Sequence, residues 1–104
     1  MPKGVNARPT FEWDERKNQQ NIKKHGLDFR DAEKMFRGVV AEPDTREDYG
    51  EKRWVGLGTS RGRILQVVFA ERGPDTVRII SLRKATRREI EQYKKKIQDG
   101  LEEG

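Results

Sequence analysis

The segment RILQVVFAE, residues 63–71, is the most apolar run of the chain. A continuous apolar run of this length is typical of a strand that is buried in the middle of a sheet. Turn-forming residues stand on both sides of it, SRG at 60–62 and RGPD at 72–75. We therefore expect this segment to be the central strand and the remaining elements to assemble around it.

Two neighbouring segments predict the flanking strands. Residues 52–59 have the sequence KRWVGLGT and residues 76–83 have the sequence TVRIISLR, and a short turn joins each to the central run. Consecutive strands with short turns predict an antiparallel meander. Because side chains alternate between the faces of a regular strand, we expect Arg83 on the face opposite Leu82, and Arg78 on the face opposite Arg83.

A helix is predicted ahead of the meander. Asp14 is a good N-cap, and Gly26 is a good residue to follow the last helical turn. Lys17, Asn21 and His25 fall four residues apart, so they share one face of that helix. The helix is therefore either peripheral or has a functional polar face.

Further elements complete the prediction. Short strand patterns occur at 11–13 and 39–41, a second helix at 28–38, and a third helix starts at Thr86, which has capping-box spacing with Glu89. Apolar residues repeat along the third helix at a spacing that would dock it on the sheet: Ile90, Tyr93 and Ile97. The predicted fold class is α+β, an antiparallel β-sheet meander with two N-terminal helices and a C-terminal helix packed on it.

The expected organisation is a flexible N-terminal arm at 1–10, a single domain at 11–99 and a short tail at 100–104. The sequence has no cysteine, which excludes disulfides, thiol catalysis and zinc–thiolate sites. It also has no apolar run of membrane-spanning length and no signal-peptide pattern. We therefore expect the protein to work in the cytoplasm.

Charge is unevenly distributed along the chain. The net charge is +5, and residues 78–96 hold eight lysines and arginines against two glutamates. Residues 42–51 hold five acidic residues and one arginine. A segregated basic region favours a polyanionic partner, chiefly nucleic acid. The alternative interpretation is an ordinary solvated surface.

Several motifs occur in an order that is specific to one family: W-D, then K-x-x-x-N-x-x-K-H-G, then R-x-I-S-x-R, then E-x-x-x-Y. On these motifs the chain resembles the BrnT toxins of bacterial type II toxin–antitoxin systems. The resemblance covers nearly all of residues 11–97, through FEWDERKNQQNIKKHGLDFRDAEKMF at 11–36, GEKRWVGLG at 50–58, GRILQVVFAERG at 62–73 and VRIISLRKATRREIEQY at 77–93.

The resemblance implies a RelE-like ribonuclease that inhibits translation by degrading RNA. It also implies neutralisation by a BrnA-like antitoxin, and repression of the operon by a complex that binds operator DNA through the antitoxin. The positions that match the family pattern are Lys24, His25, Arg53, Ser81 and Arg83.

Metal-independent RNA cleavage requires a base for the attacking 2′-OH, positive charge at the phosphorane and an acid for the leaving oxygen. Arginine suits the second role because its fork of donors matches phosphate oxygens and stays charged. Arg53 and Arg83 are the candidates, and His25 is the natural proton carrier. We expect these three side chains to gather around a single phosphodiester. The alternative for His25 is that it only terminates its helix, where a cation is favoured.

Other residues are expected to contact the RNA backbone. The RNA-binding candidates are Lys24, Arg63, Arg72, Arg78, Ser81 and Lys84. Tyr93 is either a core residue or a stacking platform for a base. The acidic residues of 42–51 resemble an exposed loop more than a magnesium site, so we expect no metal and no cofactor.

Two other functions remain open from the residues alone. A nucleic-acid-binding module without catalysis would share the basic face but would not need His25. An interaction protein with an acidic partner would bind no RNA, whereas phosphate contacts weaken steeply with salt.

Overall fold

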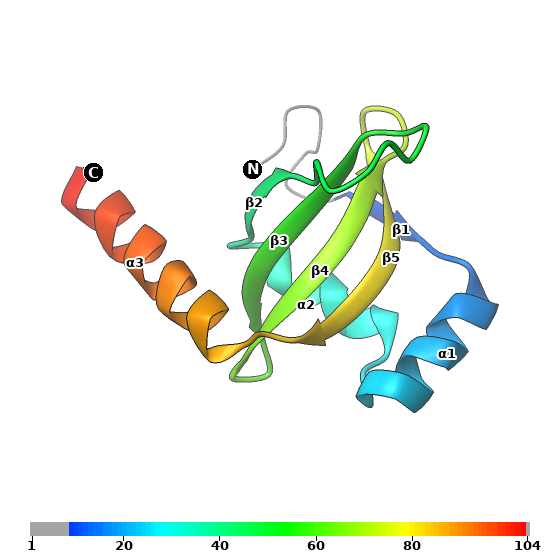
Figure 1. Cartoon of the computed structure of the whole chain (residues 1–104), viewed down its shortest axis with the longest axis horizontal. Coiled ribbons are helices and arrows are strands. Elements are labelled where there is room, and N and C mark those ends of the chain that lie inside the picture. The colour runs from blue at the N-terminus through cyan, green and yellow to red at the C-terminus, as the bar shows by residue number, and fades with distance from the viewer. Residues whose placement is uncertain (1–8, 104) are drawn as a thin grey trace.

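The computed structural model describes residues 9–103, so most of the predicted arm lies outside the described residues. Figure 1 shows the arrangement of the elements. In chain order they are β1 (Thr10–Glu12), α1 (Glu15–His25), the 3-10 helix η1 (Phe29–Asp31), α2 (Ala32–Met35), β2 (Val40–Pro43), β3 (Arg53–Ser60), β4 (Arg63–Glu71), β5 (Thr76–Lys84) and α3 (Arg87–Glu103).

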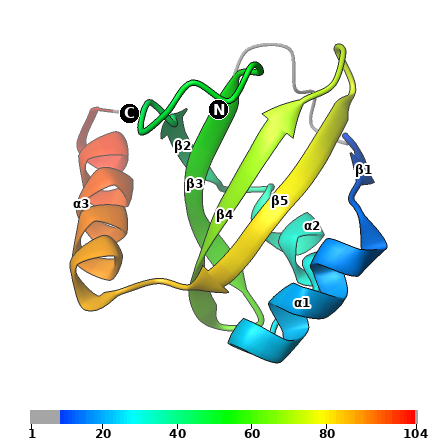
Figure 2. The same cartoon turned by 45° about the vertical axis from the view of Figure 1, so that its right-hand side comes forward.

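The sheet has five strands in the order β1-β5-β4-β3-β2. The predicted meander is present, because β3, β4 and β5 pair antiparallel with β4 in the middle, and β2 adds antiparallel to β3. The first strand, β1, pairs parallel with β5, which the meander pattern did not anticipate. Figure 2 shows β1 beside β5 at one edge of the sheet. The fold is thus α+β with a mostly antiparallel sheet.

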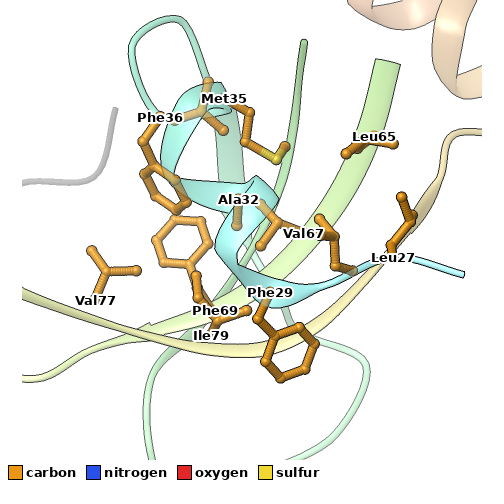
Figure 3. Packing of buried hydrophobic residues seen from close by; sticks show 12 residues of the cluster. Leu27, Phe29, Ala32, Met35, Phe36, Leu65, Val67, Phe69, Val77 and Ile79 are labelled. Atoms are coloured by element: carbon orange, nitrogen blue, oxygen red, sulfur yellow. The ribbon is translucent and has the colours of Figure 1, made fainter. Parts of the chain in front are cut away.

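The core lies between one face of the sheet and the short helices η1 and α2. We call this face the inner face and the opposite one the outer face. Phe36 packs edge-on against Phe69 with ring centroids 4.9 Å apart, and Figure 3 shows the cluster around them. The inner face contributes Leu65, Val67, Phe69, Val77, Ile79 and Leu82, and the segment from 27 to 39 contributes Leu27, Phe29, Ala32, Met35, Phe36 and Val39.

A β-bulge in β5 changes the predicted distribution of side chains between the two faces. Val68 of β4 pairs with Ser81, but the next residue, Phe69, pairs with Ile79, so Ile80 is an extra residue in β5. The extra residue shifts the alternation by one position. Arg78 therefore lies on the same face as Arg83, which corrects the prediction made for a regular strand.

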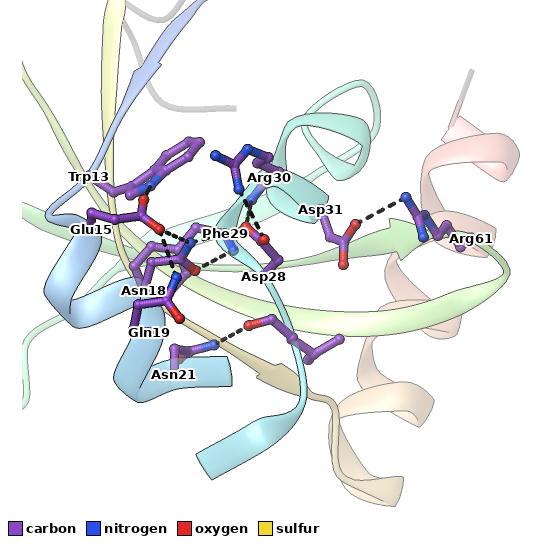
Figure 4. A network of polar contacts seen from close by, with 11 residues as sticks. Trp13, Glu15, Asn18, Gln19, Asn21, Asp28, Phe29, Arg30, Asp31 and Arg61 are labelled. Atoms are coloured by element: carbon purple, nitrogen blue, oxygen red, sulfur yellow. Dashed lines mark hydrogen bonds and ion pairs between the residues drawn. The ribbon is translucent and has the colours of Figure 1, made fainter. Parts of the chain in front are cut away.

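Two buried asparagines attach α1 to the rest of the molecule. The Asn18 side chain accepts from the Phe29 N–H at 2.8 Å and donates to Asp28 at 3.1 Å, as Figure 4 shows. The Asn21 side chain donates to the Leu82 carbonyl at 2.8 Å and accepts from the Leu82 N–H at 3.2 Å. Since β1 pairs only with Thr76–Arg78, Asn21 supplies hydrogen bonds to β5 beyond the end of β1.

The ends of α1 agree with the sequence prediction. Asp14 is the N-cap and accepts from the Arg16 and Lys17 N–H groups at 2.9 and 3.3 Å. Gly26 follows the helix with φ +72°, a left-handed conformation that glycine adopts without steric cost.

The C-terminal helix α3 stands beside the outer face rather than lying flat on the sheet (Figures 1 and 2). Its predicted capping box is confirmed: Thr86 N–H donates to Glu89 at 2.8 Å, and Glu89 N–H donates to the Thr86 hydroxyl at 3.2 Å. Of the apolar residues expected to dock it, Ile90 and Tyr93 are half-buried, but Ile97 is 41% exposed. The helix also extends into residues 100–103, which were expected to form a tail.

A groove of about 540 Å³ separates α3 from the outer face. Its sheet side is lined by Val40, Val55 and Leu57, and its helix side includes Lys95 and Lys96.

Among the described residues, no helix is long and apolar enough to cross a membrane.

We predict that Asn21→Ala lowers the free energy of unfolding by about 3 kcal/mol, because it leaves a buried N–H and two buried carbonyl groups without their partner. Urea unfolding measures the change. The exposed neighbour Gln20 is the control, and Gln20→Ala should change stability by less than about 0.5 kcal/mol. Equal effects of the two substitutions would contradict the role given to Asn21.

Candidate functional site

The outer face carries four of the predicted site residues, in three rows that follow the sheet register. Arg53, Ala70 and Arg78 form the first row, Val55, Val68 and Ser81 the second, and Leu57, Gln66 and Arg83 the third. Four of the nine candidate residues from the sequence therefore project from one surface: Arg53, Arg78, Ser81 and Arg83.

The first row is a cluster of arginines joined by carboxylates. Arg53 Nε donates to Glu51 at 3.1 Å, and its guanidinium lies 4.1 Å from the centroid of the Tyr49 ring. Arg72 reaches the same Glu51 carboxylate at 3.5 Å. Arg78 donates to Glu12 of β1 at 2.8 Å. Glu51 thus links the predicted catalytic Arg53 to the predicted RNA-binding Arg72 at this end of the sheet.

The third row centres on Arg83 and a residue of α3. Arg83 donates through Nη1 and Nη2 to the two carboxylate oxygens of Glu89, at 2.8 and 3.0 Å. Gln66 donates to Glu89 at 2.7 Å. The Arg83 guanidinium is the main cause that holds the pKa of the Glu89 carboxyl below its usual value. This pair ties the first turn of α3 to the outer face.

His25 lies in a separate hollow of about 290 Å³ at the edge of β5. Lys24 and Ser81, both candidates from the sequence, line the same hollow. Lys17, Asn21 and His25 all line it as well, as expected for one helix face. Ser81 belongs both to this hollow and to the second row of the outer face, so it connects the imidazole to the arginine surface.

The candidate residues do not all lie at one point. Arg53 and Arg83 occupy rows that are four residues apart along β4, a separation of about 13 Å between rows at 3.3 Å per residue. The reason is that β3 and β5 run in the same direction, and Arg53 begins its strand whereas Arg83 nears the end of its own. The alternation of side chains along β4 and β5 assigns Arg63 and Lys84 to the inner face. Both are exposed, and both lie at the end of the sheet opposite Arg53.

Sequence reasoning missed the carboxylates that pair with the arginines. Glu12, Glu51 and Glu89 come from β1, the loop before β3 and α3, and each bonds an outer-face arginine. Glu89 was recognised only as a helix cap, although its side chain has acceptors enough for Arg83 as well. No sequence spacing predicts the Glu12 pair, because its partner is 66 residues away.

The acidic segment is a structured loop rather than a purely solvated one. The Asp44 side chain is 1% exposed and accepts from Arg46 Nε and Nη2, both at 2.8 Å. These bonds lower the pKa of Asp44 to about 2. The loop ends at Tyr49 and Glu51, so its ordering places both of them against Arg53.

Comparison with known proteins identifies the family. The family model described as the ribonuclease toxin BrnT of type II toxin–antitoxin systems matches residues 13–89. The chain belongs to the BrnT family. A solved structure of the Brucella abortus ribonuclease toxin BrnT, a crystal structure at 1.1 Å resolution, is also similar. The sequences are 33% identical, the TM-score is 0.64, and the likeness covers 76% of this chain and 99% of that chain. The curated proteins contain no match.

Membership of the BrnT family assigns the chain to the ribonuclease toxins of type II toxin–antitoxin systems. Such a system implies an antitoxin partner and RNA targets. The matched stretch contains every candidate site residue and ends at Glu89, so the body of α3 lies beyond it.

The Asp44 pair predicts a specific dependence of stability on pH. Because the pKa of Asp44 is lowered from 3.8 to about 2, its contribution is complete above pH 3.8 and is lost as the pH falls through about 2. We expect Asp44→Asn to cost about 1 kcal/mol at neutral pH, a value reduced by the 65% exposure of Arg46. Urea unfolding at several pH values measures the difference, which should shrink on acidification. A difference that stays constant with pH would contradict this assignment.

Proposed function

We propose that the chain is a metal-independent endoribonuclease that cuts RNA at the outer face by attack of the 2′-OH on the adjacent phosphodiester. The observation that carries this proposal is the alignment of Arg78, Ser81 and Arg83 on one surface by the bulge in β5, with Arg53 in register beside them. A single strand of RNA laid across three rows meets arginine at both ends.

The proposed roles follow from position. Arg83 binds the reacting phosphodiester and stabilises the negative charge that develops on it, a role for which its bidentate donors are suited. A neighbouring phosphate is bound by Arg53, Arg72 and Arg78, because the row that holds Arg53 and Arg78 lies about 13 Å along the sheet from the row of Arg83. Lys24 and Ser81 contribute further contacts to the RNA backbone, and the exposed Arg63 and Lys84 contribute them where the RNA passes the end of the sheet nearest Arg83.

His25 is the proposed proton carrier. In the first step, the 2′-oxygen forms a bond to phosphorus while its proton leaves to a base, and the bond from phosphorus to the 5′-oxygen breaks as that oxygen gains a proton. The products are a 2′,3′-cyclic phosphate and a 5′-hydroxyl. Support for His25 comes from its place in one hollow with Ser81, two residues from Arg83 on the same face.

The biological setting is part of the same proposal. Cleavage of cellular RNA in the cytoplasm would inhibit translation, and a BrnA-like antitoxin would neutralise it. Operator DNA would be bound only through the antitoxin complex. We also propose that the sheet and its helices correspond to the RelE-like ribonuclease fold.

The test is cleavage of purified total RNA in the presence of EDTA. We predict that the protein degrades RNA under these conditions and that Arg83→Ala lowers the rate by about 100-fold, the usual effect of removing one donor to a developing anion. Arg37, an exposed arginine that follows α2 on the inner side, is the charge-matched control. RNA that stays intact at high protein concentration would refute the proposal, and equal effects of Arg83→Ala and Arg37→Ala would refute the site.

A second prediction concerns His25. His25→Ala should lower the rate and flatten the dependence of the rate on pH near neutrality, because imidazole is the side chain that ordinarily titrates there. The measurement is a pH–rate profile with a labelled oligoribonucleotide. His25→Gln is a control that keeps a polar side chain of similar size but cannot carry the proton. A profile of unchanged shape in both variants would make His25 a structural residue.

A further inference from the structure

We infer that Glu89 is a positioning residue that masks the phosphate-binding donors of Arg83, so that RNA binds there by replacing the Glu89 carboxylate with a phosphodiester. The inference rests on the proposed role of Arg83 in RNA binding. It gives Glu89 a role beyond capping α3, and it adds the release of the Glu89 carboxylate from Arg83 as a step before RNA cleavage.

Three of the five N–H donors of Arg83 are used within the protein, including one on each Nη atom. Nη1 donates to Glu89 at 2.8 Å and to the Lys84 carbonyl at 3.0 Å, and Nη2 donates to Glu89 at 3.0 Å. A guanidinium has five N–H donors, and the pair of parallel donors that grips a carboxylate is also the pair that grips a phosphate. Arg83 therefore cannot hold a phosphodiester with both Nη atoms while Glu89 keeps its place.

The Glu89 carboxylate lies among hydrogen-bond donors that can bind an anion. It accepts hydrogen bonds from Arg83, from Gln66 of β4 at 2.7 Å and from the Thr86 N–H at 2.8 Å. A phosphodiester carries the same single negative charge and offers two free oxygens of similar spacing. The donors that hold the carboxylate are thus suited to the proposed substrate.

The site opens on the groove between α3 and the outer face. Gln66 and Glu89 line that groove together with two cations of α3, Lys95 and Lys96, and two further carboxylates, Glu42 and Asp99. The side chains of Arg83 and Glu89 are 33% and 18% exposed, so solvent reaches the pair, and Glu89 is the member of the pair that lines the groove. A strand of RNA that enters the groove would meet the lysines and this pair together.

Glu89 is the least exposed of the three carboxylates, at 18% against 28% for Glu51 and 43% for Glu12, but it differs from them in the element that carries it. Glu51 is shared between Arg53 and Arg72, and Glu12 belongs to a strand that is paired within the sheet. Glu89 instead belongs to α3, which stands off the sheet and leaves a groove behind it. Movement of the first turn of α3 would release the carboxylate without disturbing the core.

The experiment compares Glu89→Gln with Glu91→Gln. Both substitutions remove one negative charge from α3, but Glu91 is exposed and does not take part in the bonds to Arg83. The probe is a fluorescein-labelled single-stranded oligodeoxynucleotide, which lacks the 2′-OH and so cannot be cut by the proposed mechanism. Fluorescence anisotropy gives the Kd. We expect Glu89→Gln to lower the Kd roughly three- to tenfold relative to Glu91→Gln, as for release of a partly exposed ion pair.

A double-mutant cycle shows whether Glu89 acts through Arg83. In the Arg83→Ala background, Glu89→Gln should give no gain over Glu91→Gln, because no guanidinium remains to be unmasked. With cleavable RNA, Glu89→Gln should lower KM by a similar factor and change kcat by less than roughly twofold. If Glu89 only capped α3, Glu89→Gln would not raise the affinity for the probe, and the Arg83→Ala substitution would not alter the effect of Glu89→Gln.

The outcomes separate the inference from the proposed function. If Arg83→Ala leaves probe binding unchanged, the proposed RNA site at Arg83 fails. If Arg83→Ala weakens binding but Glu89→Gln does not exceed Glu91→Gln, the site stands and the masking is refuted. If circular dichroism shows that Glu89→Gln does not fold, Glu89→Asp is the deciding variant, because it keeps the charge but shortens the reach to Arg83. Tighter probe binding by Glu89→Asp supports masking, and unchanged or weaker binding refutes it.

Discussion

The pairing of the Asn21 side chain with both backbone groups of Leu82 is the interaction on which the arrangement of the site depends. β1 is too short to cover the whole edge of β5, and an uncovered edge strand leaves unpaired N–H and C=O groups. Asn21 acts there as a one-residue replacement for a neighbouring strand. The same bonds fix the position of α1, and hence of His25, relative to Ser81 and the arginines beyond it.

Much of the positive charge of the outer-face arginines is offset by carboxylates within the protein. Four arginines are paired with three carboxylates that come from β1, the loop before β3 and α3. Such pairs contribute little to stability when exposed, but they keep long side chains oriented and limit repulsion between like charges. The outer face that the charge pattern indicated as basic is therefore a set of ion pairs rather than a row of unpaired arginines.

Much of the fold followed from the sequence because its signals are local. The apolar run at 63–71, the turns around it, the caps at Asp14 and Gly26 and the Thr86–Glu89 capping box each require only neighbouring residues, and all are confirmed. The bulge at Ile80 and the parallel pairing of β1 were not predictable, since both depend on contacts between distant segments. The separation of Arg53 from Arg83 has the same origin: alternation predicts the face of a strand, whereas register sets the distance along it.

The place of β1 has a consequence for synthesis on the ribosome. Its partner β5 lies more than sixty residues later in the chain, since Glu12 pairs with Arg78. Contacts of such long range form late in folding because a large loop must close first. The edge of the sheet, and with it the arginine surface, is completed only after nearly the whole polypeptide has emerged from the exit tunnel. An unfinished chain therefore lacks the assembled arginine surface to which we assign RNA binding.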